Sequence, residues 1–244
     1  MLFENGRRAM ESLKRFTQLS YAKHLYTDGR IILVDVPLEL CAREKMRELK
    51  TADGKGLVLL EIEQLANDLE RFLAGLIEKE KDILFVFPGN GSNYPKSVSR
   101  ICQEANGVGV YAKRIWTPGS DPFAVAGSIM PEVFLNLDVQ TIIVVDDVIS
   151  SGQTMYKLYR NNEWRFPRAK WIAATWVSQI PQMKSRSGVN GYINSVVACM
   201  VEGPNKRRVP INSLSTLREQ PAITEDYARR HFSDPKAFLS IVSS

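Results

Sequence analysis

The sequence is poor in the residues that build metal and disulfide sites. It has three cysteines and two histidines in 244 residues. Cys41, Cys102 and Cys199 lack the paired spacing of a zinc site or of a thioredoxin-like motif. His24 and His231 fall in no metal-ligand or catalytic-triad spacing. We therefore expect buried, reduced thiols and structural histidines.

Long apolar runs are also missing. No uninterrupted stretch approaches the roughly 18 to 20 residues that cross a bilayer, and residues 1–8 lack the charged-then-apolar order of a secretory signal. We expect a cytoplasmic protein without a membrane partner.

The formal charge of +5 suits an anionic ligand, but 27 acidic residues nearly match 32 basic ones. The composition therefore demands no nucleic-acid partner, and the basic run 206–208 is expected to be a solvated turn.

Alternating hydrophobic periodicities dominate the middle of the chain. A long amphipathic helix follows Leu60, with apolar residues at helical spacing. Strands are predicted at 83–87, 107–112, 141–145, 171–177 and 195–201, and helices at 94–105 and from about Thr154. Strands that alternate with helices favour parallel βαβ units. Residues 60–202 are thus predicted to form a doubly wound, mainly parallel α/β sheet of about five strands.

The flanks, residues 1–59 and 203–244, are expected to form an accessory substructure. A strand is predicted at 30–36, a helix at 38–50 and a loop at 51–56. After Gly203-Pro204 breaks the pattern, a short helix is predicted at 224–232 with Thr224 as its cap.

The segment 141–155, TIIVVDDVISSGQTM, combines an apolar strand, two acids and a small turn that starts a helix. Ligands of open α/β sheets lie at the carboxyl ends of strands, where this turn would fall. Gly152 allows main-chain amides to face one concavity, and the helix N-terminus adds partial positive charge. Asp146 and Asp147 are acceptors suited to a sugar diol or to magnesium-bound water. The segment predicts a site for ribose 5-phosphate.

This segment resembles the signature of the type I phosphoribosyltransferases. The resemblance is dense over about fifteen residues and agrees with the βαβ spacing over roughly 140. It implies that Asp146 and Asp147 contact the ribose hydroxyls and magnesium of phosphoribosyl diphosphate. The implied substrate-binding residues after them are Val148, Ile149, Ser150, Ser151, Gly152, Gln153 and Thr154, and the last five would bind the 5-phosphate.

Two further parts of the site are implied by the same resemblance. The loop Pro88-Gly89-Asn90-Gly91-Ser92, with Gly89, Asn90 and Gly91 as its implied binding residues, lies where the family binds diphosphate, although an ordinary glycine-rich turn is an alternative. Lys113 and Arg114 resemble a basic pair that some members aim at the diphosphate, and a solvated pair is the alternative. Residues 116–128 fit the mobile loop that closes over the site.

The resemblance leaves the acceptor open. An acid stands at the position of Ser150 in the hypoxanthine and guanine branch, so Ser150 speaks against that branch. In this fold a variable hood holds the base, and the two flanks are its candidates. Tyr227, Phe232 and Phe238 are candidates to stack on a base, but aromatic residues at such spacings more often belong to a core.

The resemblance implies a magnesium-dependent transfer of a phosphoribosyl group to an unidentified nitrogen nucleophile, with release of diphosphate. A homodimer is expected because family members are commonly dimers. The main alternative is a non-catalytic regulator on the same fold that senses phosphoribosyl diphosphate or a nucleotide. A nucleic-acid-binding protein with basic flanks is a third possibility, marked by salt-dependent binding without a response to phosphoribosyl diphosphate.

Overall fold

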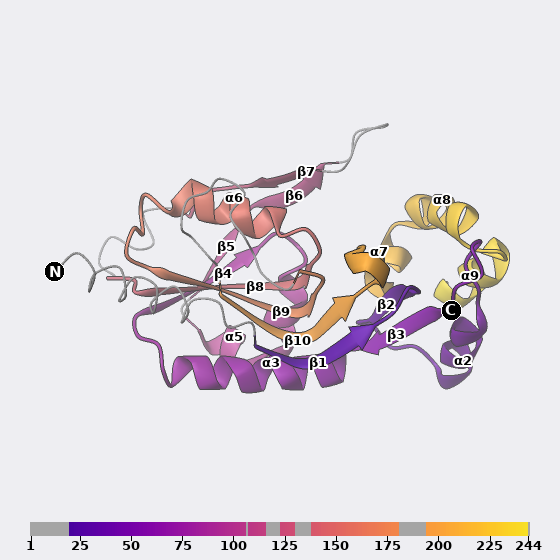
Figure 1. Cartoon of the computed structure of the whole chain (residues 1–244), viewed down its shortest axis with the longest axis horizontal. Coiled ribbons are helices and arrows are strands. Elements are labelled where there is room, and N and C mark those ends of the chain that lie inside the picture. The colour runs from indigo at the N-terminus through magenta and orange to yellow at the C-terminus, as the bar shows by residue number, and fades with distance from the viewer. Residues whose placement is uncertain (1–19, 106, 116–122, 130–137, 181–193, 244) are drawn as a thin grey trace. The chain divides into compact units, whose positions relative to one another are not determined.

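The computed structural model describes residues 20–105, 107–115, 123–129, 138–180 and 194–243 (Figure 1). The chain divides into two compact units: one combines Met1–His24 with Ala66–Met200, and the other combines Leu25–Leu65 with Val201–Ser244. Both predicted flanks thus contribute to the second unit. Within the described ranges, no helix is long and apolar enough to cross a membrane.

The larger unit is built on a six-stranded sheet. Its elements are β1 (Ser20–Tyr26), α3 (Ile62–Ile77), β4 (Ile83–Pro88), α4 (Asn93–Val98), α5 (Arg100–Glu104), β5 (Gly107–Val110), β6 (Ala112–Ile115), β7 (Phe123–Ala126), β8 (Thr141–Ile149), α6 (Gln153–Asn162), β9 (Lys170–Ser178) and β10 (Asn194–Glu202). The first strand, the last strand and α3 also reach into the second unit. β6 and β7 form a separate antiparallel pair.

The strand order β1-β10-β9-β8-β4-β5 makes this sheet doubly wound. The pairings between β10 and β9, β9 and β8, β8 and β4, and β4 and β5 are all parallel. The winding reverses between β4 and β8, and ligands of such sheets bind outside the carboxyl ends at this switch point. α6 covers one face, while α3 and α5 cover the other (Figure 1). The predicted fold class is confirmed, with six strands.

Several predicted boundaries differ from the structure. The helix predicted at 94–105 is interrupted at Ser99, whose extended backbone separates α4 from α5. Ser99 Oγ accepts a hydrogen bond from the Cys102 amide at 3.0 Å and donates one to the Glu70 carboxylate of α3. Of the predicted loop 116–128, residues 116–122 lie outside the described residues, and Phe123–Ala126 forms a strand.

The second unit has its own parallel sheet, in the order β11-β2-β3. Its elements are β2 (Arg30–Val34), α2 (Leu40–Glu48), β3 (Leu57–Glu61), the 3-10 helix η2 (Pro204–Lys206), β11 (Ile211–Ser213), α7 (Leu214–Glu219), α8 (Pro221–His231) and α9 (Pro235–Val242). Its core contains Phe232 and Phe238, whose rings stack with centroids 4.1 Å apart. The cap prediction for Thr224 is wrong, because α8 begins at Pro221 and the Thr224 hydroxyl donates to the Leu217 carbonyl at 2.6 Å.

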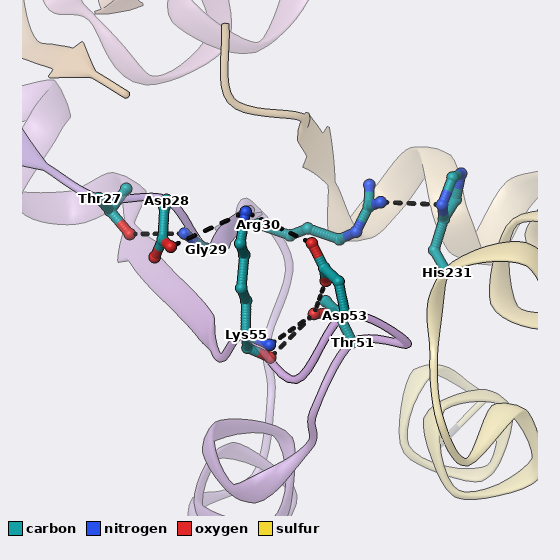
Figure 2. Close-up of polar contacts among 8 residues, drawn as sticks. All are labelled: Thr27, Asp28, Gly29, Arg30, Thr51, Asp53, Lys55 and His231. Atoms are coloured by element: carbon teal, nitrogen blue, oxygen red, sulfur yellow. Dashed lines mark hydrogen bonds and ion pairs between the residues drawn. The ribbon is translucent and has the colours of Figure 1, made fainter. Parts of the chain in front are cut away.

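Polar contacts connect the turn 51–55 and the end of α8 to this unit (Figure 2). The Arg30 guanidinium Nη2 lies 2.8 Å from His231 Nδ1. Since a guanidinium only donates, Nδ1 is the acceptor and carries no proton. The Thr51 hydroxyl accepts from the Lys55 amide at 2.9 Å, and the Ala52 amide donates to the His231 carbonyl at 3.0 Å. The bond between Arg30 and the unprotonated Nδ1 is therefore one that the neutral form of the His231 imidazole makes.

Candidate functional site

The two acids lie near the end of β8, and the strand continues through them. β8 pairs with β9 as far as Ile149, whereas its pairing with β4 extends only to Val144. Asp146 and Asp147 thus lie beyond the last residue that pairs with β4, at the switch point of the sheet. Both residues are half-buried. The sequence pattern predicts that this strand ends at Val145, and the structure corrects this by extending the strand to Ile149.

Each carboxylate is fixed by the main chain that follows it. Asp146 Oδ1 accepts from the Asp147 amide at 3.0 Å, and Asp147 Oδ1 accepts from the Val148 amide at 2.7 Å. The Thr175 hydroxyl of β9 donates to the Asp147 carbonyl at 2.9 Å. Groups held in this way need little reorganisation when a ligand binds.

The turn that follows has the conformation that its glycine allows. Gly152 has φ 70° and ψ 3°, a left-handed conformation that disfavours other residues. It immediately precedes α6, whose first turn closes with a 2.9 Å bond from the Tyr156 amide to the Gly152 carbonyl. The Ser151 hydroxyl accepts a long bond of 3.4 Å from the Gln153 amide. Ser150 and Thr154 are half-buried. A small turn at a helix N-terminus is suited to an anion.

The loop after β4 meets the acid pair. A Cβ atom built on Gly91 would lie 2.6 Å from Asp147 Oδ1 and 2.9 Å from Asp146 Oδ1. Real Cβ atoms essentially never approach another heavy atom so closely, so a side chain at position 91 would require the two carboxylates to move. The structure therefore brings together two parts of the predicted site that are 55 residues apart in the sequence.

The same loop contacts the start of β6. Gly89 has φ 63°, and a Cβ on it would lie 2.5 Å from the Ala112 carbonyl oxygen. The Gly89 amide donates to the Val110 carbonyl at 2.9 Å. Lys113 and Arg114 directly follow Ala112 in β6, which pairs with β7. The backbone of the predicted basic pair thus begins beside the loop.

Among the described residues, no group of three or more histidines, cysteines or acids forms a metal cage. Magnesium seldom needs one, because it retains water and binds through one or two carboxylates together with substrate phosphates. Asp146 and Asp147 supply hard oxygen donors at the mouth of the predicted anion-binding turn. The residues present therefore fit a magnesium ion that arrives with a phosphorylated ligand.

Some predicted site residues have a structural position instead. The Ile149 side chain is 3% exposed and belongs to a buried hydrophobic cluster, and its carbonyl accepts a hydrogen bond from the Gln179 amide at 2.9 Å. Phe232 and Phe238 are 3% and 0% exposed, which excludes them as base-stacking residues in this structure. The sequence places Ser92 in the predicted loop but does not indicate that its side chain is fully buried. No local pattern marks it, because its burial depends on tertiary packing.

No family model and no curated protein matches the sequence. Similar solved structures include a Helicobacter pylori xanthine-guanine-hypoxanthine phosphoribosyltransferase, with 13% identity and a TM-score of 0.43 over 67% of this chain and 94% of that one. A purine phosphoribosyltransferase from Pyrococcus horikoshii has 14% identity and a TM-score of 0.40 over 63% of this chain and 90% of that one. A hypothetical protein from Neisseria gonorrhoeae with bound ppGpp has 17% identity and a TM-score of 0.43 over 68% and 86%, respectively.

Proposed function

We propose that the chain binds phosphoribosyl diphosphate at the carboxyl ends of β4 and β8 and transfers its phosphoribosyl group to a nitrogen nucleophile. The nucleophile attacks C1 of the ribose, the bond from C1 to the diphosphate oxygen breaks, and diphosphate leaves. The observation that supports this most is the contact of Gly91 with the paired acids, because it joins an anion-binding loop to a diol-binding carboxylate pair.

Each part of the site has a separate task in this proposal. Asp146 and Asp147 accept hydrogen bonds from the ribose hydroxyls, and the turn 150–154 binds the 5-phosphate through main-chain amides and hydroxyls. The Gly89–Gly91 loop, with Lys113 and Arg114, receives the diphosphate. The protein contributes mainly orientation and charge neutralisation, and no side chain has to form a covalent bond.

Magnesium is the expected cofactor, and Asp146 and Asp147 would hold it through its bound water. When bound, it would offset the negative charge that develops on the departing diphosphate. The acceptor is not specified by the acid pair, because the carboxylates recognise the sugar. We also propose that the chain forms a homodimer and acts in the cytoplasm.

Removal of the acid pair tests the site. The double variant Asp146→Asn, Asp147→Asn should bind phosphoribosyl diphosphate at least about tenfold more weakly in calorimetry with magnesium, because each lost charged hydrogen bond costs about 1.5 to 3 kcal/mol. The exposed Asp138→Asn is the control for loss of negative charge, and it should bind like the wild type. Unchanged affinity in the double variant would remove the site assignment.

Turnover needs a second assay. Diphosphate release should be measured against a panel of purine and pyrimidine bases and of amines, with phosphoribosyl diphosphate in excess. Release with one class of acceptor supports the transferase and identifies the nucleophile. Tight binding without release against every acceptor would instead favour a regulator that senses the same ligand.

A further inference from the structure

Ser92 is the buried hydroxyl of the loop that meets the acid pair. Its side chain is 0% exposed, and its Oγ donates a 2.9 Å hydrogen bond to the carbonyl oxygen of Gly89. A buried hydroxyl without a partner is costly, and so is a buried carbonyl that loses one. The hydrogen bond from Ser92 to Gly89 therefore stabilises the loop more than the same bond from an exposed serine would.

Three further hydrogen bonds make the loop a closed turn. The Gly89 amide donates to the Val110 carbonyl at 2.9 Å, which connects the first residue of the turn to β5. The Asn93 amide donates to the Asn90 carbonyl at 3.0 Å, and the Lys96 amide donates to the Ser92 carbonyl at 3.1 Å. Ser92 thus joins the turn to α4, while its hydroxyl reaches back to the residue where the turn begins.

The position of Gly91 depends on this closure. Gly91 lies between Gly89 and Ser92 in sequence, and its Cα approaches both carboxylates so closely that a Cβ would collide with them. A looser turn would move the main chain at Gly91 away from the two carboxylates. An anion that must be bound beside the acids would then lose its main-chain donors.

We propose that Ser92 is a positioning residue that holds the Gly89–Gly91 turn in the shape that binds the diphosphate. The role rests on the proposed function, since it requires a ligand whose diphosphate reaches this turn. Ser92 touches no ligand itself and acts through the Gly89 carbonyl. Its loss should therefore weaken recognition of the diphosphate and spare recognition of the 5-phosphate, which lies at the other end of the ligand.

The variant Ser92→Ala removes one oxygen atom and little volume. Calorimetry with magnesium should show affinity for phosphoribosyl diphosphate reduced by up to about tenfold, the shift expected when the unliganded turn loses one hydrogen bond. Affinity for ribose 5-phosphate, which lacks the diphosphate, should remain at the wild-type value. Amide hydrogen exchange at Asn90 and Gly91 should be faster in the unliganded variant.

Ser97→Ala is the matched control. Its hydroxyl also donates to the carbonyl three residues earlier, that of Tyr94, at 2.9 Å, but Ser97 is exposed on α4. It should leave both affinities and the exchange of residues 90 and 91 unchanged.

The outcomes separate the two proposals. Equal affinity for phosphoribosyl diphosphate in the wild type and Ser92→Ala, or equal weakening for both ligands, overturns the role of Ser92 alone. Wild-type protein that binds neither ligand overturns the proposed function, and the role of Ser92 with it.

Discussion

Replacement of Gly91 by alanine tests the central contact of the site directly. The three atoms nearest to a Cβ on Gly91 are Asp147 Oδ1 at 2.6 Å, Asp146 Oδ1 at 2.9 Å and Asp147 Cγ at 3.1 Å, so every close neighbour belongs to the acid pair. Positive φ values occur at other described glycines, namely Gly54, Gly89 and Gly152. The cost of Gly91→Ala should therefore come from lack of space.

Overpacking of this kind costs about 1 to 3 kcal/mol of unfolding free energy. Part of that cost is avoided if the carboxylates move, and a movement would disturb the diol site instead. We expect Gly91→Ala to lose about 1 to 3 kcal/mol in urea unfolding, and to bind phosphoribosyl diphosphate about 10- to 100-fold more weakly, since 1.4 kcal/mol corresponds to tenfold.

A double-mutant cycle identifies the cause. In a background with Asp146→Ala and Asp147→Ala, the colliding atoms are absent, so Gly91→Ala should cost close to nothing. The control Gly75→Ala, where a Cβ meets nothing within 4 Å in α3, should raise stability by about 0.5 to 1 kcal/mol. An equal cost of Gly91→Ala with and without the carboxylates would refute the steric reasoning.

Two further predictions concern titratable groups. Burial, reinforced mainly by the charges of Arg30 and Arg230, lowers the pKa of His231 below its usual value. The unfolded chain therefore binds the proton more readily, and the unfolding free energy should fall as the pH drops from about 6.5 through the pKa of His231 in the folded protein. Urea unfolding of the wild type and of His231→Asn at several pH values measures this. A difference in unfolding free energy between the two proteins that does not change with pH would contradict it. Burial also raises the pKa of the Cys102 thiol to about 11, so in the native protein a thiol reagent at pH 8 should modify the exposed Cys41 at once and Cys102 only on unfolding. Equal rates at the two cysteines would show that the thiol of Cys102 is accessible.

The sequence predicted the parts of the fold that local pattern determines. The apolar run before Asp146 predicted a buried strand, and the parallel sheet around it follows from the alternation of strands and helices. The continuation of β8 to Ile149 is set by its pairing with β9. Two adjacent aspartates disfavour a strand locally, so that extension was not predictable from the segment itself.

Long-range contacts account for the other differences. The helix break at Ser99 is fixed by Glu70, which is 29 residues away on α3. β11 has only three residues, and most of β1 is exposed. Each of the two strands lies beside a strand that is far away in the sequence. Some missed signals were present, however. Pro221 marks the first residue of α8, and Asp234 caps α9 just before Pro235, both typical of helix starts.

The candidate site was predictable in its composition and only partly in its geometry. Asp146, Asp147 and Gly152 have the positions that the motif suggests, because the motif is contiguous. The contact of Gly91 with both carboxylates depends on the switch point of the sheet, which brings β4 beside β8. The burial of Ser92 was not predictable, because a buried serine and an exposed serine look alike in sequence.

The sheet of the second unit has a consequence for synthesis. β2 pairs on one side with β3, which follows it closely, but on the other side with β11, with Ile31 opposite Ile211. A ribosome must therefore add some 180 residues after β2 before that edge can be covered. During this interval the nascent chain exposes an unpaired apolar strand, which is a known hazard for aggregation. Cells that make this protein would thus benefit from a chaperone that binds the emerging chain early.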